Sequence, residues 1–389
     1  MKSKVIYIIL FLISALILSI AITSCTLNVN IVSEHVHTTE TTVETTTETT
    51  TITEINISMV GDVLAHEGVY GSAVITDGTY TFDHLFTHIK DDISSSDIAI
   101  INQETILGGR ELGLSAYPLF NSPNEIGNSC VNAGFNVILH ATNHALDKGE
   151  AGIENTLNFW RTKHPQIAVL GIHATKEDYD NNSVYIYTKN NVKVAVLNYT
   201  YSTNGIPLPY DHTVNIMKED KIKKDLEYAR NNADFVIVCP HWGTEYRHTP
   251  DESQIKWAQF FADNGADLII GTHPHVIQPV KYIDNARGGK TLVYYSLGNF
   301  VSNQDTVDTM LGAMAKVTIT NKGGNVHISK YAVEPLVTHM LFGPGLITTY
   351  KLEEYNDTLA SQNKVSIFGE KMSMEKLYSI CNEVLGTNY

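Results

Sequence analysis

The sequence predicts an α/β fold with a largely parallel sheet, and three observations support this prediction. Short β-branched apolar runs alternate with helical patterns from about residue 55 to residue 300, which is typical of α/β proteins. Most of these runs are apolar throughout, as expected for strands of a sheet covered on both faces. The chain has 389 residues, enough for one large domain or two ordinary ones.

A polar cluster follows each of the predicted strands. In chain order, residues 57–60 lead to Gly61 and Asp62, 97–101 to Asn102, Gln103 and Glu104, 136–139 to Asn143 and His144, 194–197 to Asn198, 235–239 to His241, 268–270 to His273 and His275, and 292–295 to Asn299. Ligands of open α/β sheets bind at the carboxyl ends of the strands. We therefore expect the functional residues among these clusters.

Two of the intervening helices have clear start and stop signals. A capping box with Pro at the first helical position, residues 122–125, opens a helix that runs to Gly134. Residues 249–252 repeat the device, and their helix ends at Gly265.

The end of the chain predicts a hairpin and one helix. Residues 313–320 and 325–333 flank the turn residues 321–324, and this hairpin could extend a second sheet packed on the first. Residues 373–385 predict a helix. We therefore assign residues 55–340 to the folded domain and 341–389 to a C-terminal extension with one helix.

The amino-terminal segment predicts export. Lys2 and Lys4 precede an apolar run over residues 5–22, as in a secretory signal peptide. Small residues then lead to Cys25, as in a bacterial lipobox, so residues 1–24 are the predicted signal peptide and Cys25 the lipidated residue. The alternative is an uncleaved anchor helix, because the run is nearly long enough to span a bilayer. Either reading places the domain on the extracytoplasmic face of the cell membrane.

Residues 25–54 predict a disordered tether. Residues 38–54 are almost entirely Thr and Glu, and such a composition buries too little surface to offset chain entropy. The remaining cysteines, Cys130, Cys239 and Cys381, are odd in number and lack metal-type spacing, so their pairing stays open, and Cys239 is best interpreted as a core residue.

The formal charge of −15 argues against nucleic-acid binding, which needs a basic face. An anionic substrate would have to be attracted by local positive charge, and bound metal is the natural source.

His273, Pro274 and His275 predict a two-imidazole clamp. In an extended segment, side chains two residues apart point to the same side, and Pro274 limits the backbone. Imidazole is a common ligand of zinc, iron and manganese. The plain alternative is that one ring bonds a backbone carbonyl and the other is merely exposed.

The strand ends together carry the ligand types of a hydrolytic site with two metals. Carboxylates, an amide oxygen and imidazoles bind such ions. The candidates are Asp62, Glu104, Asn143, His144, His241, His273 and His275.

Each candidate could also have a purely structural role instead of binding metal. Asp62 could be a turn residue, Glu104 a loop acid, Asn143 the cap of a helix near Asp147, and His241 a packed loop imidazole. Asn299 could only support a turn and is left outside the site, and His66 is a further candidate ligand.

At this point the motifs resemble a known family. Gly61-Asp62, Asn102-x-Glu104, residues 141–149, 241–246, 271–278 and 296–300 resemble, in order, the motif series of the CapA family of bacterial capsule or poly-γ-glutamate synthesis proteins. That family is related to the calcineurin-like metallophosphoesterases. The resemblance implies a four-layer α/β/β/α sandwich.

The resemblance also implies roles for individual residues. Asp62 and Glu104 would be early acidic ligands, with Glu104 as a bridge, and His241, His273 and His275 late imidazole ligands. Asn143 would be a ligand, and His144 would assist the leaving group, so that His144 and Asn143 are the catalytic candidates. Two departures stand out: Val63 and Leu64 follow Asp62 where the phosphoesterases have Asp-x-His, and Gln103 occupies a position that is usually apolar.

Three functional hypotheses follow. The first is a lipid-anchored, metal-dependent protein that synthesises or transfers poly-γ-glutamate or a similar anionic surface polymer, with membrane polymer-synthase subunits as partners. The second is a metal-dependent phosphoesterase on a cell-surface phosphate ester. The third is a scaffold subunit without catalysis. One or two divalent ions are expected, and the sequence does not distinguish manganese, zinc and iron.

Overall fold

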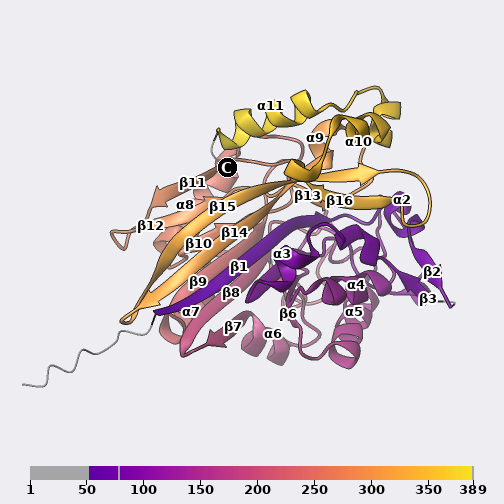
Figure 1. Ribbon diagram of the computed structural model, residues 1–389. Coiled ribbons are helices and arrows are strands. Elements are labelled where there is room, and N and C mark those ends of the chain that lie inside the picture. The colour runs from indigo at the N-terminus through magenta and orange to yellow at the C-terminus, as the bar shows by residue number, and fades with distance from the viewer. Residues whose placement is uncertain (1–51, 78, 388–389) are drawn as a thin grey trace, which may run out of the picture. The chain divides into compact units, whose positions relative to one another are not determined.

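The computed structural model describes residues 52–77 and 79–387, and two mixed sheets form its centre (Figure 1). The predicted signal peptide, Cys25 and nearly all of the tether lie outside the described residues. The last three tether residues are an exception, because Ile52, Thr53 and Glu54 begin the first strand.

The first sheet combines parallel and antiparallel strands. Its order is β16 (Ile347–Lys351), β15 (Asn325–Met340), β14 (Leu311–Lys322), β1 (Ile52–Val63), β4 (Ile98–Asn102), β5 (Val137–Leu139) and β6 (Ala168–Leu170), and β13 (Asn299–Val301) also pairs with β1. The strands β1, β4, β5 and β6 are parallel, so their carboxyl ends lie along one edge.

The second sheet has a parallel centre and antiparallel edges. Its order is β11 (Val280–Asp284), β12 (Lys290–Tyr294), β10 (Leu268–Ile270), β9 (Phe235–His241), β8 (Val192–Thr200) and β7 (Val184–Lys189). A small hairpin, β2 (Val74–Thr76) and β3 (Thr79–Thr81), lies outside both sheets.

Helices cover the outer faces of the two sheets, which gives four layers (Figure 1). The first sheet packs against α4 (Glu125–Ala133) and α5 (Gly149–Lys163), and the second against α7 (Glu219–Asn232) and α8 (Glu252–Asp263). The other helices are α2 (Glu67–Gly71), α3 (Lys90–Ser94), α6 (Lys176–Asn182), α9 (Val307–Met310), α10 (Asp357–Gln362) and α11 (Met374–Leu385). The predicted α/β/β/α sandwich is confirmed.

Side-chain alternation on β8 shows how the layers are held together. Val194 and Val196 join the core between the sheets, whereas Ala195 and Leu197 join the cluster under α7 and α8. Both faces are buried, so the strand is apolar throughout, as the sequence predicted. Cys239 belongs to the core between the sheets and, like Cys130, is a buried thiol without a disulfide.

Both predicted helix starts are shifted by a few residues. The cap of α4 is Asn124, and the Ser122 hydroxyl instead lies 2.7 Å from that of Thr105. The capping box of α8 is real, but Asp251 forms it with Gln254. In each case the cap lies two residues further along the chain than the sequence suggested.

The C-terminal part continues the first sheet. The predicted hairpin exists as β14 and β15, but it pairs with β1 rather than adding to a second sheet. The extension holds β16 and α10 as well as the expected helix, α11, and the described residues form one compact unit. The extension is therefore part of the domain.

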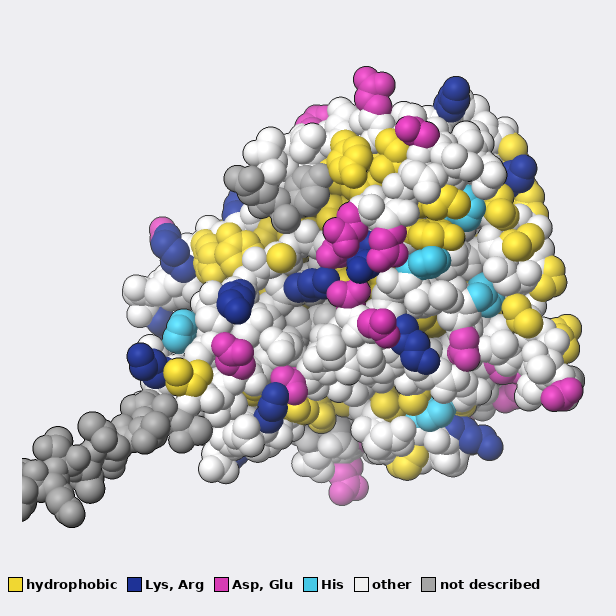
Figure 2. Space-filling model, viewed as in Figure 1, with side chains coloured by type: hydrophobic (Ala, Val, Ile, Leu, Met, Phe, Trp, Pro, Cys, Tyr) yellow, Lys and Arg dark blue, Asp and Glu magenta, His cyan; other side chains and the backbone are white. Residues whose placement is uncertain are grey.

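Charges of both signs are interspersed on the face drawn in Figure 2, which shows no continuous basic patch. Among the described residues, no helix is both long and apolar enough to cross a bilayer.

Candidate metal centre

The candidate metal centre lies where strand ends of the two sheets meet. In the first sheet, Asp62 of β1 stands opposite Asn102 of β4 in the parallel register. In the second, a bridge joins His241, the last residue of β9, to the loop that follows β10. A hydrogen bond of 3.1 Å from the His273 N–H to Asp62 Oδ2 connects the two sheets at this point.

The structure brings five of the predicted ligand residues into one buried group. The residues Asp62, Glu104, His241, His273 and His275 are each at most 3% exposed. Glu104 Oε1 lies 3.6 Å from His241 Nε2, and Glu104 Oε2 lies 3.8 Å from His275 Nδ1. Asp62 Oδ2 lies 3.5 Å from His275 Nδ1.

Three of these residues form a group that could hold a metal ion. Ligand atoms of Glu104, His273 and His275 all lie within 4.8 Å of one another. Both carboxylate oxygens of Glu104 and Nδ1 of His273 are buried, and no hydrogen bond from the described residues reaches them. A buried polar atom without a partner is costly, so these atoms fit a cation as their missing partner.

The buried carboxylates of the group need positive charge close by. Burial alone would raise the pKa of Glu104, but His275 and His241 hold it below its ordinary value. Burial opposes protonation of His275, yet Glu104 and Asp62 raise its pKa to about 9. Burial keeps the pKa of His273 well below its ordinary value. A protonated His275 therefore offsets part of the negative charge of these two buried carboxylates, and a bound divalent ion would do the same.

Asp62 is held by hydrogen bonds on both oxygens. Its Oδ1 accepts from Asn102 Nδ2 at 2.7 Å, and its Oδ2 accepts the His273 N–H. The carboxylate lies beside the group of three, and its ligand role stays a prediction.

His241 and Asn143 contact each other. His241 Nε2 lies 2.8 Å from Asn143 Oδ1, and His241 Nδ1 lies 3.0 Å from the Thr272 hydroxyl. The amide oxygen of Asn143 therefore points toward the centre, as a ligand or a substrate contact would. Its ligand and catalytic roles remain predictions.

The two-imidazole clamp forms by a different geometry from the predicted one. The strand β10 ends at Ile270, and the clamp lies in the following turn. His273 and His275 both have positive φ, +100° and +61°, which is uncommon for residues other than glycine. The alternation argument was therefore wrong, because a left-handed turn, and not an extended strand, brings the rings within 5.7 Å. Backbone strain of this kind persists where surrounding contacts hold it, often at functional sites.

His144 is held by Asp147. The His144 Nδ1–H donates to Asp147 Oδ2 at 2.7 Å, and the same oxygen accepts the Phe120 N–H at 2.7 Å. The Phe120 ring packs edge-on against His144, with centroids 4.7 Å apart. These contacts leave Nε2 of His144 as the nitrogen available to a ligand.

Sequence reasoning missed two amides at the centre. Asn299, left outside the site, begins β13 beside Asp62, and its Oδ1 lies 3.1 Å from His275 Nδ1. Asn102 links Asp62 to His241, whose Nδ1 lies 3.4 Å from Asn102 Nδ2. Both stand at a strand end beside Asp62, so the pattern that found Asp62 would also have found them.

His66 is near the centre but outside the group of three. Its Nδ1 lies 3.2 Å from the Leu64 carbonyl, and its ring packs edge-on against Phe120. Burial lowers the pKa of His66 to about 4, so the ring is neutral near pH 7. A neutral imidazole is the form that binds metal.

A cavity of about 410 Å³ adjoins the centre. Its lining residues include His66, His144 and His275. The candidate acid, His144, and a residue of the metal group therefore face the same space.

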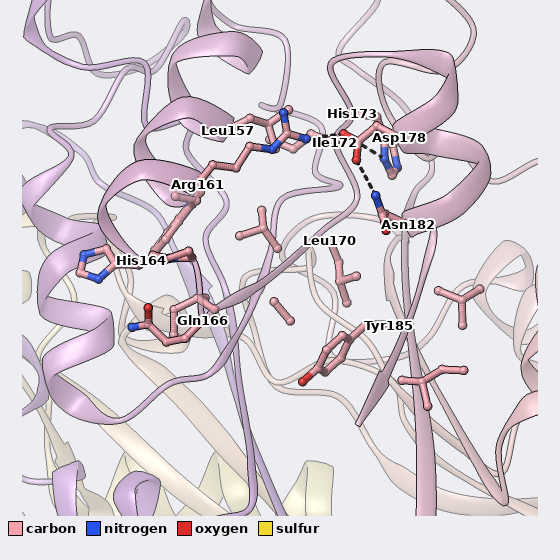
Figure 3. A pocket seen from close by; sticks show the side chains of 17 residues that line it. Leu157, Arg161, His164, Gln166, Leu170, Ile172, His173, Asp178, Asn182 and Tyr185 are labelled. Carbon is pink, nitrogen blue, oxygen red and sulfur yellow. Dashed lines mark hydrogen bonds and ion pairs between the residues drawn. The ribbon is translucent and has the colours of Figure 1, made fainter. Parts of the chain in front are cut away.

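A larger cavity, of about 590 Å³, lies elsewhere and is shown in Figure 3. Its polar groups bond one another, because Asp178 accepts from the charged Arg161 Nη2 at 2.6 Å and from the amide Nδ2 of Asn182 at 2.8 Å. None of the candidate metal ligands lines it. The smaller cavity is the candidate active site.

Comparison with known proteins supports the resemblance seen in the sequence. Residues 56–304 match the family described as bacterial capsule synthesis protein PGA_cap. The PGA biosynthesis protein CapA of Bacillus subtilis (strain 168) is 31% identical over 216 residues, which cover 53% of this chain and 51% of that protein. The capsule biosynthesis protein CapA of Bacillus anthracis is 28% identical over 286 residues, which cover 69% of this chain and 65% of that protein. The chain thus spans between about half and two thirds of these relatives.

Solved structures with a similar arrangement share little sequence with this chain. A 5'-nucleotidase precursor from Thermus thermophilus has a TM-score of 0.49 and 12% identity, covering 73% of this chain and 54% of that one. The calcineurin-like phosphoesterase YfkN from Bacillus subtilis has a TM-score of 0.40 and 10% identity, covering 86% of this chain and 99% of that one.

Proposed function

This chain belongs to the PGA_cap family of bacterial capsule synthesis proteins, and from that premise we propose that it acts in synthesis or transfer of poly-γ-glutamate or a similar anionic surface polymer. We also propose that it works on the extracytoplasmic face of the cell membrane, anchored through lipid on Cys25, beside membrane polymer-synthase subunits. The names of the two CapA relatives support the polymer role.

The observation that carries the proposal is the buried group of Glu104, His273 and His275. An anionic polymer would be repelled by a chain of charge −15 unless positive charge is concentrated locally. The oxygens of Glu104 that lack partners fit a divalent cation, which supplies that charge.

The roles of the residues follow from their positions. Glu104, His273 and His275 would hold the ion, with Asp62, His241 and Asn143 beside them. When bound, a divalent ion supplies Lewis acidity toward a carboxyl or phosphoryl oxygen.

The proton chemistry falls to His144. His144 lines the cavity and its Nε2 would donate a proton to the leaving group, while Asp147 holds Nδ1–H and stabilises the charged ring. The burial of the centre keeps water from competing with the bound substrate.

Complementation of a deletion strain tests the proposal. Cells that express the wild-type chain should recover surface polymer, and cells with Glu104→Gln should not. Glu353→Gln, which changes an exposed carboxylate on η3 (Leu352–Glu354), is the matched control and should restore polymer. Surface polymer that is unchanged by the deletion would contradict the proposal.

A phosphate ester is the second candidate substrate, because the dyad of His144 and Asp147 beside a metal group would serve that reaction equally. Turnover of phosphomonoesters and phosphodiesters with added manganese would support it, and a panel without turnover would exclude it.

A further inference from the structure

The mouth of the active-site cavity combines carboxylates with aromatic rings. Among its lining residues, Tyr117, Tyr246 and Asp305 are exposed and Glu245 is half-buried, whereas His144 and its neighbours are buried. Among the described residues, no Lys or Arg lines the cavity. The four outer residues form what we call the cavity mouth.

The ring of Tyr246 is fixed in place. Its backbone has a φ of +62°, and its N–H donates to the Pro274 carbonyl at 2.8 Å within the clamp. Its hydroxyl lies 3.2 Å from Gln304 Nε2, which donates to it. The ring centroid lies 5.9 Å from that of His275. An otherwise strained tyrosine is thus held between the metal group and solvent.

Two further rings line the cavity. Tyr117 packs edge-on against Phe120, with centroids 6.4 Å apart, and Phe120 contacts His144. Rings therefore extend from solvent to the candidate acid.

In the described part of the chain, the carboxylates of the mouth have no Lys or Arg beside them, and the nearest cationic group is His275, whose pKa Glu245 helps to raise. Among residues 52–77 and 79–387, neither Glu245 nor Asp305 forms an ion pair. Carboxylates beside tyrosine rings attract an ammonium group through charge and cation–π contact. The same carboxylates repel a run of polymer carboxylates.

We propose that the cavity mouth binds the ammonium group at the amino-terminal end of a γ-linked glutamate polymer. The inference rests on the proposed function. The interior of such a chain carries a carboxylate on every residue, and its α-amino terminus is the single ammonium group. Since α-amino groups have a pKa of about 7.7–8.0, this end is charged at neutral pH. The mouth thus selects the chain end over the chain interior.

Calorimetric titration of the full-length protein with two probes tests the inference. The probes are penta-γ-glutamate with a free amino terminus and the same peptide with an acetylated terminus, at about pH 6.5, where the free amine is charged. The wild-type protein should bind the free probe about tenfold more tightly. In the double variant Glu245→Gln/Asp305→Asn this preference should vanish, and the acetylated probe should bind more tightly because the repulsion is gone.

A control variant separates the local effect from net charge. Asp211→Asn/Asp284→Asn makes the same charge change at two exposed positions away from the cavity, and it should keep the tenfold preference. Equal binding of both probes by the wild-type protein would overturn the ammonium site and leave the proposed function standing. A preference that survives in the Glu245/Asp305 variant would do the same.

A third outcome separates the two proposals. If neither probe binds, the proposed substrate is wrong, and butylammonium against 1-butanol then tests the mouth alone. Resonances of labelled Tyr117 and Tyr246 that shift with butylammonium in the wild type, and not in the double variant, support the ammonium site. Their failure to shift overturns it.

Discussion

Replacing Asp147 by Asn should separate catalysis from metal binding. Asp147 Oδ2 accepts two hydrogen bonds of 2.7 Å, from His144 Nδ1 and from the Phe120 N–H. Asn has the same shape but no charge, and because both donors meet the same oxygen, its amide oxygen at that position accepts both bonds without the negative charge that stabilises a charged ring. If it turns its NH₂ toward His144, the ring adopts the tautomer that carries the proton on Nε2 and loses its charge partner.

The expected magnitudes differ for activity and stability. A positioned acid or base raises the rate by a factor of roughly 10²–10⁴, and Asp147→Asn should lose most of this factor. Exchanging a charged acceptor for a neutral one in these buried hydrogen bonds should cost about 1–3 kcal/mol of unfolding free energy. The assay is the initial rate of surface polymer accumulation in the complemented deletion strain, with metal content and thermal melting measured on the purified variant. Wild-type polymer accumulation would refute the role of the dyad and favour the scaffold hypothesis, whereas loss of polymer with metal and fold intact would exclude the scaffold.

Three further predictions concern stability. Added manganese or zinc at about 100 times its dissociation constant should raise the unfolding free energy by about 2.7 kcal/mol in denaturant titrations, and Glu104→Gln should abolish this gain; an equal gain in the variant would contradict the metal assignment. Gly61→Ala should cost about 1–3 kcal/mol, because a Cβ there would overlap the Gly298 carbonyl and force the backbone apart; a neutral effect in the same titration would disprove that close approach. Burial opposes protonation of His248, but hydrogen bonds to Asp308 and a backbone carbonyl raise its pKa, so its stabilising effect is full below the unfolded pKa of about 6.5 and is lost as pH rises through the folded value. The destabilisation by His248→Gln should therefore be larger at pH 6 than at pH 9, and a pH-independent difference would count against it.

The convergence of the strand ends could be predicted because parallel strands impose it. Asp62 lies at the carboxyl end of β1 and Glu104 just past the neighbouring strand β4, so correct strand assignments bring them together whatever the details of the loops. In the second sheet, His241 ends β9 and His273 follows β10, and the parallel pairing of these two strands brings the two residues together in the same way. The contact between the two groups depended on the face-to-face packing of the sheets, which the sequence pattern alone does not specify.

Local backbone geometry could not be predicted in the same way. The positive φ of His273 and His275 has no sequence signal, because histidine does not favour that region as glycine does. Ser122 satisfied the pattern of a capping residue, but its hydroxyl is used by Thr105, a contact across the chain that a local motif does not reveal. Asn299 belongs to a strand-end cluster, but its place beside Asp62 depends on the pairing of β13 with β1, which joins segments more than two hundred residues apart.

The most direct test of the account is the metal content of purified protein. Elemental analysis should find bound divalent metal in the wild-type chain and in His327→Ala, which removes an exposed imidazole on β15. His273→Ala should lose most of this metal, because it removes one of the three buried groups that would hold the ion. A wild-type protein with no more metal than His273→Ala would contradict the central claim.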